Sequence, residues 1–130
     1  MSNHFGEHLT LDGYGGEERL LDSQETVLRA LNELVDLLGM KILAEPQVYF
    51  AESNEIKDPG GWTGVVVIME SHISIHTFPK RGFVSADVYT CQNGLNTDLI
   101  ISYFKKAFNL KDVETNFIKR GIKYPGQNIY

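Results

Sequence analysis

Cysteine is almost absent from this chain, since Cys91 is the only one among 130 residues. A single thiol cannot form an internal disulfide, which fits a reducing compartment, and we expect a cytoplasmic protein. Basic residues are also few, because 12 lysines and arginines stand against 17 acidic residues, for a net charge of -5. This balance argues against a nucleic-acid partner, whose binding surfaces are usually basic, and is compatible with a cationic substrate.

Long apolar runs are missing as well. No run approaches the roughly 18 residues of a transmembrane helix, and no basic-then-apolar leader opens the chain. We therefore expect neither membrane insertion nor secretion. What is present is an ordinary globular composition, with 42% hydrophobic and 22% charged residues, and a length that predicts one domain over residues 1–130.

Two segments carry apolar residues at helical spacing. The first begins at a capping residue, Asp22 or Ser23, and ends at Gly39. The second begins at Asn96 or Thr97 and runs to about Phe108. Strands are predicted at residues 8–12, 40–51 with an interruption at Pro46, 62–69, 71–78, 83–91 and 112–118. This order predicts an α+β fold, a two-layer sandwich with one largely antiparallel sheet and both helices on one face.

A cluster of reactive side chains follows the apolar run 65–68. Glu70, Ser71, His72 and His76 lie within seven residues, and Cys91 ends the next strand-like run. A buried serine is ordinarily bonded to its own backbone, and a lone cysteine is ordinarily a small buried hydrophobe. Their joint occurrence points to chemistry instead.

The segment from residue 63 to residue 91 resembles the prokaryotic S-adenosylmethionine decarboxylases. The matching elements, in matching order and spacing, are Gly64-Val65-Val66-Val67-Ile68, Glu70-Ser71-His72, Ile75-His76-Thr77 and Ala86-Asp87-Val88-Tyr89-Thr90-Cys91. The resemblance implies the same α+β fold, a small-molecule amine substrate, and a homodimer of processed protomers.

The resemblance also implies that the chain makes its own cofactor. Cleavage between Glu70 and Ser71 would leave a β chain of residues 1–70 and an α chain of residues 71–130, whose first residue becomes a pyruvoyl group. In this family the pyruvoyl ketone takes the substrate amine as a Schiff base and accepts the electrons left when CO2 departs.

Three further residues take roles from the resemblance. His76 matches the histidine that handles protons during processing, and a pKa near neutrality suits that work. Thr63 stands where many members have a serine that assists processing, and it keeps the hydroxyl. Cys91 matches the cysteine that returns a proton to the substrate carbon.

His72 and Asp87 are interpreted as structural. His72 and His76 share one strand face, but their spacing is too wide for a helix-type zinc site and no third ligand is evident. We therefore predict no metal site.

Two departures concern the substrate. Lys80 stands where the family that the chain resembles usually has a glutamate that holds the ribose hydroxyls, and an ammonium cannot accept hydrogen bonds. The loop of residues 55–59 lacks the aromatic residue that stacks on adenine, although Tyr49, Phe50 or Trp62 could substitute. Phe78 remains a candidate stacking surface.

These departures favour a pyruvoyl-dependent decarboxylase of polyamine biosynthesis acting on a basic amino acid, L-arginine or L-ornithine. Glu52, Glu55 or Asp58 could then bind the substrate side chain. One alternative is an S-adenosylmethionine decarboxylase with a rearranged pocket, supplying aminopropyl groups for spermidine. Another is a non-catalytic regulatory paralogue, although such proteins usually lose the processing residues and this chain keeps them.

Overall fold

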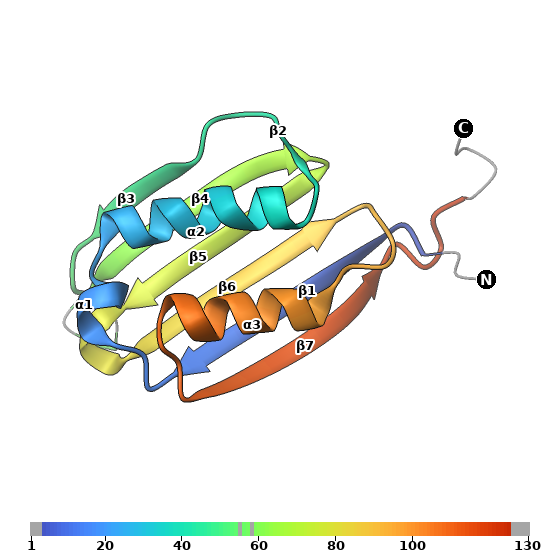
Figure 1. Cartoon of the computed structure of the whole chain (residues 1–130). Coiled ribbons are helices and arrows are strands. Elements are labelled where there is room, and N and C mark those ends of the chain that lie inside the picture. The colour runs from blue at the N-terminus through green and yellow to red at the C-terminus, as the bar shows by residue number, and fades with distance from the viewer. Residues whose placement is uncertain (1–3, 55, 58, 126–130) are drawn as a thin grey trace.

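The computed structural model describes residues 4–54, 56–57 and 59–125. Its strands are β1 (Gly6–Tyr14), β2 (Lys41–Ile42), β3 (Gln47–Ala51), β4 (Gly61–Met69), β5 (Ser71–Phe78), β6 (Phe83–Thr90) and β7 (Asp112–Arg120). Its helices are α1 (Glu18–Leu21), α2 (Gln24–Leu37) and α3 (Thr97–Ala107), with a short 3-10 turn, η1 (Pro79–Arg81). Figure 1 shows α2 and α3 lying side by side over the sheet.

The seven strands form one sheet in the order β2-β4-β5-β6-β1-β7, and β3 also pairs with β4. Every pairing is antiparallel. The β4–β5 hairpin closes through Glu70 alone, whereas η1 connects β5 to β6 at the opposite end of the sheet (Figure 1). These two ends of β5 carry different parts of the candidate site.

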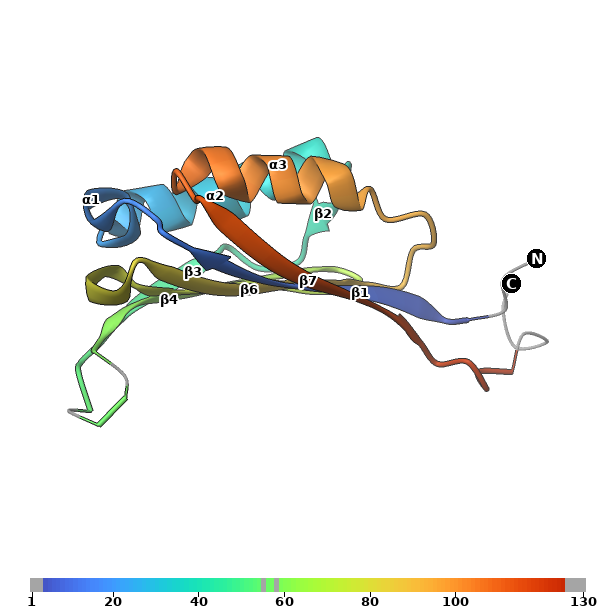
Figure 2. The same cartoon turned by 90° about the horizontal axis from the view of Figure 1, so that it is seen from below.

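Both long helices cover the same face of the sheet, as Figure 2 shows from the side. Each begins at a side-chain cap, with Ser23 accepting from the Thr26 amide and Asn96 accepting from the Leu99 amide. Their apolar stripes pack on alternate strand residues to form the core. Its fully buried members include Val27, Leu31, Leu34, Val66, Ile68, Ile73, Ile75, Val84, Ile100, Phe104 and Phe108. The predicted α+β sandwich with helices on one face is confirmed.

Several boundaries differ from those predicted from the sequence. The segment 40–44 contributes only the two-residue β2, which pairs with the end of β4, before Pro46 interrupts the strand. The last strand extends two residues beyond Ile118, because β1 continues to pair with it as far as Arg120. The four-residue α1 was missed, since it is too short to show helical periodicity.

The other face of the sheet is not covered by either helix (Figure 2). It carries the second set of alternating strand residues, including the partly buried His8, His72, His76 and Asp87. Exposed apolar side chains also lie there, among them Val67 and Met69. No helix in the described ranges is long and apolar enough to cross a membrane.

Candidate active site

Ser71 begins β5 directly after the one-residue connection, in a backbone conformation unusual for serine. Its φ is 112°, in a region that side chains rarely adopt. Such a residue costs on the order of 1–3 kcal/mol and persists only where its surroundings impose it. Here the pairing of Ser71 with Ile68 on β4 and with Thr90 on β6 imposes it. The predicted cleavage point is therefore a strained junction held from both sides.

Cys91 follows β6 and lies beside this junction. Its Sγ donates to a carboxylate oxygen of Glu70 at 3.1 Å. Burial raises the pKa of the Cys91 thiol, and the hydrogen bond and negative charge of Glu70 raise it further. Cys91 is therefore a protonated thiol at neutral pH. The structure thus brings together three of the residues predicted for the site: Glu70, Ser71 and Cys91.

Thr63 and His76 form a second pair, in register across β4 and β5. The Thr63 hydroxyl and His76 Nδ1 lie 3.3 Å apart on the uncovered face. His76 follows Ser71 by five positions on one strand, and a strand rises about 3.3 Å per residue, so the two are roughly 16 Å apart. One chain therefore does not bring His76 to the serine on which it is predicted to act.

Phe78 and Lys80 lie at the same end of β5 as His76. The Phe78 ring packs against Phe83, with ring centroids 5.3 Å apart. Lys80 lines a cavity of about 310 Å³ together with Phe50 and acidic residues that include Glu52.

One of the three aromatic substitutes suggested by the sequence lines this cavity. Phe50 lines the cavity and packs against Trp62 at 5.2 Å, so two of the three substitutes suggested by the sequence are adjacent. The indole of Trp62 donates to Asp22 at 3.2 Å, which fixes the ring. Glu55 and Asp58, suggested partners of a basic substrate, lie outside the described residues.

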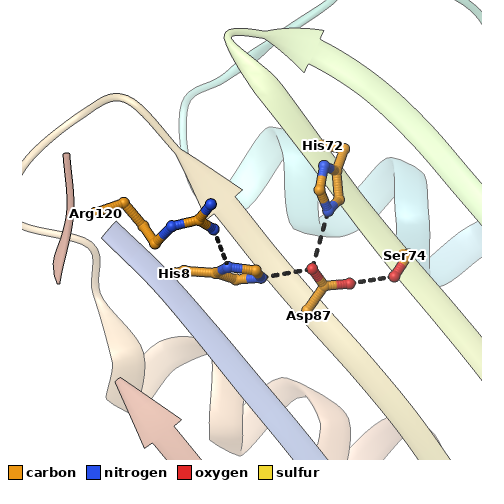
Figure 3. Close-up of polar contacts among 5 residues, drawn as sticks. All are labelled: His8, His72, Ser74, Asp87 and Arg120. Carbon is orange, nitrogen blue, oxygen red and sulfur yellow. Dashed lines mark hydrogen bonds and ion pairs between the residues drawn. The ribbon is translucent and has the colours of Figure 1, made fainter. Parts of the chain in front are cut away.

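A hydrogen-bond network on the uncovered face joins four adjacent strands (Figure 3). Asp87 accepts from His8 Nε2 at 2.6 Å, from His72 Nε2 at 2.9 Å, and from the Ser74 hydroxyl. Arg120 Nη1 contacts His8 Nδ1 at 2.9 Å, and its guanidinium lies 4.6 Å from the centre of the Tyr89 ring. His72 therefore pairs with Asp87, a contact that is compatible with the structural interpretation of each residue.

The charges within this network follow from its donors. Half-burial would raise the pKa of Asp87, but hydrogen bonds from Ser74, His72 and His8 outweigh it and lower the pKa. Arginine can only donate, so His8 Nδ1 accepts and His8 Nε2 carries the proton given to Asp87.

The same residues meet one geometric requirement of a metal site. The ligand atoms of His8, His72 and Asp87 all lie within 4.8 Å of one another. Sequence reasoning did not select His8 as a third potential ligand, because His8 lies on another strand, 64 positions before His72. The alternation of that strand did indicate the face on which His8 lies. In this arrangement a metal ion would have to displace the proton that His8 Nε2 donates to Asp87, beside the positive charge of Arg120.

Glu7 organises the loop that follows Cys91. It is 6% exposed, and one of its oxygens accepts from the Gly94 amide at 3.0 Å and the Leu95 amide at 2.8 Å. The other oxygen lies 2.9 Å from His4 Nε2. Sequence reasoning did not select Glu7, because an acid in an alternating strand shows no sign of a partner almost 90 residues away.

Comparison with known proteins extends the likeness to nearly the whole chain. The sequence signature of the family described as S-adenosylmethionine decarboxylase matches residues 7–121. The S-adenosylmethionine decarboxylase proenzyme of Clostridium botulinum (strain Langeland) is 33% identical over 116 residues, which is 89% of this chain and 94% of that protein. The proenzyme of Thermococcus kodakarensis is 31% identical over 118 residues, covering 91% of this chain and 78% of that protein.

A solved structure agrees in fold as well as in sequence. The crystal structure of the adenosylmethionine decarboxylase from Aquifex aeolicus superimposes with a TM-score of 0.78 at 29% identity, over 92% of this chain and 93% of the other. Fold and sequence together place the chain among the pyruvoyl-dependent carboxy-lyases. It belongs to the prokaryotic S-adenosylmethionine decarboxylase family.

Proposed function

We propose that this chain cleaves itself between Glu70 and Ser71 and then decarboxylates S-adenosylmethionine. The observation that carries the proposal is the junction itself, where a serine with φ of 112° lies beside a protonated thiol. The relatives that are 31–33% identical to this chain are named proenzymes, which supports a processed chain.

The cleavage uses groups of the chain and, in its last step, one water molecule. The Ser71 hydroxyl attacks the Glu70 carbonyl, and the peptide nitrogen leaves, so that an ester replaces the amide. Elimination then breaks the bond between the Ser71 side-chain oxygen and its carbon, releasing the Glu70 carboxylate as the end of a 1–70 chain. Hydrolysis of the resulting dehydroalanine releases ammonia and leaves a pyruvoyl group at the start of the 71–130 chain.

The pyruvoyl group would supply the electron sink for decarboxylation. Cys91 is placed to hold the proton that the substrate carbon needs after CO2 leaves, because its thiol lies beside the junction and stays protonated at neutral pH. Glu70 contributes by keeping that thiol protonated, and its own carboxylate needs no further role.

S-adenosylmethionine is preferred as the substrate over the basic amino acid favoured by the sequence. The relatives are named for S-adenosylmethionine. The lack of an aromatic residue in the 55–59 loop also argues less strongly against S-adenosylmethionine, because Phe50 offers a ring in the cavity beside Lys80. Lys80 alone then argues against a nucleoside, and another acceptor could hold the ribose hydroxyls.

A basic amino acid remains the second candidate, and a specific observation favours it. The cavity that Lys80 lines also carries Glu18, Asp22 and Glu52. Their carboxylates could bind a guanidinium or ammonium, while Lys80 could pair with the substrate carboxylate. L-arginine and L-ornithine are the substrates that this arrangement suits.

We further propose that two copies of the chain build each active site. His76, with Thr63 beside it on β4, lies about 16 Å along β5 from Ser71, which is too far for proton transfer within one copy. Two uncovered sheet faces stacked about a two-fold axis across the strands would place the Ser71 end of one copy over the His76 end of the other. The apolar Val67 and Met69, about half exposed on this face, suit burial in such a homodimer.

Intact mass and CO2 release test the activity. Purified protein should appear as two chains of residues 1–70 and 71–130 and should release CO2 from S-adenosylmethionine. Ser71→Ala should remain one chain and release none. Release from L-arginine or L-ornithine but not from S-adenosylmethionine would select the second candidate. A single uncut chain in the wild type would refute the enzyme and favour the regulatory paralogue.

Complementation tests the shared site. Neither Ser71→Ala nor His76→Ala should be cut when expressed alone. In a mixed dimer, one site combines Ser71 of the His76→Ala chain with His76 of the Ser71→Ala chain. Co-expression should therefore restore cutting of the His76→Ala chain. Failure of this chain to be cut in stable mixed dimers would show that each copy processes itself.

A further inference from the structure

Asp87 lies on β6, a strand that the proposed cleavage leaves intact, yet its partners follow the cleavage point directly. His72 and Ser74 are the second and fourth residues of the chain that would begin at position 71. Both donate to Asp87, one to each carboxylate oxygen (Figure 3). One carboxylate therefore holds both of the side chains at the start of β5 that lie on the uncovered face.

We propose that Asp87 is a positioning residue that anchors the new N-terminal segment after cleavage. This inference rests on the proposed function, because only a cut chain has a free end at Ser71. Before cleavage, Glu70 tethers β5 to β4 through the shortest connection in the sheet. Cleavage removes that tether, and a freed strand end tends to fray because fewer constraints oppose its opening.

Asp87 is itself held by side chains from β1 and β7, the strands on the other side of β6 from β5. His8 on β1 gives its Nε2 proton to the same oxygen that His72 contacts, and Arg120 on β7 contacts the other nitrogen of His8. Arg120 also lies over Tyr89, two residues before Cys91. The network thus ties the freed end of β5 to the strand that leads into the predicted proton donor.

The position of the anchor matters for the chemistry. The reacting group at position 71 must stay within reach of the Cys91 thiol, and a displacement of about 1 Å can cost a large part of the rate. Strand pairing alone holds β5 through backbone bonds that open most easily at a chain end. The two side-chain bonds to Asp87 oppose that opening within four residues of the end.

The test compares Asp87→Asn in two backgrounds, the self-cut wild type and the uncut Ser71→Ala chain. If Asp87 anchors the free end, the substitution should lower the melting temperature by about 5 °C or more in the cut protein and clearly less in the uncut one. Amide exchange in residues 72–78 should accelerate in the cut protein only. Asp12→Asn, an acid-to-amide change on the same face of β1, is the matched control and should affect both backgrounds equally.

A kinetic measurement separates positioning from general stability. Cut Asp87→Asn should lose at least tenfold in kcat while KM stays within about twofold, because the freed end and not the substrate pocket is disturbed. If Asp87→Asn fails to fold, Ser74→Ala takes its place in the same comparison, because Ser74→Ala removes only one of the donors to Asp87.

Several results would overturn the anchor. Equal destabilisation in both backgrounds would make the network an ordinary structural one. Absence of cleavage in folded Asp87→Asn would place its role before the cut. A melting temperature that rises with added Zn²⁺ in the wild type, but not in His72→Ala, would identify a metal site instead. An uncut wild type would refute the proposed function itself, which intact mass distinguishes from these outcomes.

Discussion

Removing the Glu7 side chain should destabilise the loop that follows Cys91. Its carboxylate accepts from two backbone amides of that loop, at 3.0 and 2.8 Å, and is 6% exposed. A hydrogen bond to a charged group contributes about 1.5–3 kcal/mol, but the exposed Gly94 amide can turn to water. We therefore expect Glu7→Ala to lower the free energy of unfolding by about 2–4 kcal/mol.

Glu7→Gln should be milder, because the amide oxygen can still accept from both backbone groups. It loses the charge, so about 1 kcal/mol is expected. For a chain of this size each kcal/mol corresponds to about 4 °C in melting temperature, so the two variants should separate clearly in thermal unfolding. Glu45→Ala, an exposed acid in the β2–β3 connection, is the control and should change little.

The pH dependence gives a second check. Burial alone would raise the pKa of Glu7, but hydrogen bonds from Leu95, His4 and Gly94 outweigh it, so the pKa in the folded protein lies below the ordinary 4.5. A lowered pKa means that Glu7 contributes stability above pH 4.5 and loses it as the pH falls through the folded value. Wild type should therefore lose more stability than Glu7→Gln on acidification below that pH.

The reasoning on Glu7 would be refuted by either of two results. One is a Glu7→Ala protein within about 0.5 kcal/mol of wild type, which is the range of ordinary surface substitutions. The other is the same acid dependence in wild type and Glu7→Gln, which would assign it to other carboxylates.

Three further predictions concern the site and its support. Cys91→Ser should leave self-cleavage complete but lower turnover by about 100-fold or more. Wild-type turnover should fall only above pH 9, because the pKa of the thiol is raised above 9.0. Full activity of the serine variant would show that the thiol is not the proton donor. Gly61→Ala should abolish soluble expression, because φ is 155° and the added Cβ would lie 1.9 Å from the Thr77 carbonyl oxygen; a normal melting temperature would contradict this. Lys80→Glu should lower KM for S-adenosylmethionine about tenfold by supplying an acceptor for hydroxyl groups, and an unchanged KM would place the ribose elsewhere.

Local sequence signals determined most of the secondary structure. The strand from Ser71 to Phe78 ends where alternation and Pro79 predicted, and α2 and α3 begin after Ser23 and Asn96, each one of the two capping residues that the sequence allowed. Alternation also assigned the faces of β5 correctly. These features depend on neighbours within a few residues, which one sequence displays completely.

Motif spacing determined which residues to examine, and strand pairing brought some of them together. Glu70 and Cys91 meet because β5 and β6 are adjacent, a pairing that the short connection at residues 79–82 made predictable. The family resemblance suggested their roles, and the comparisons confirmed the family.

The separation of His76 from Ser71 already follows from the strand predicted at residues 71–78, because five positions in an extended chain span roughly 16 Å. Only the tertiary structure decided the arrangement of the remaining groups. His8 reaches Asp87, and Glu7 reaches the loop after Cys91, because β1 inserts between β6 and β7. Strand order is set by long-range packing and pairing, so no local pattern along the chain specifies it.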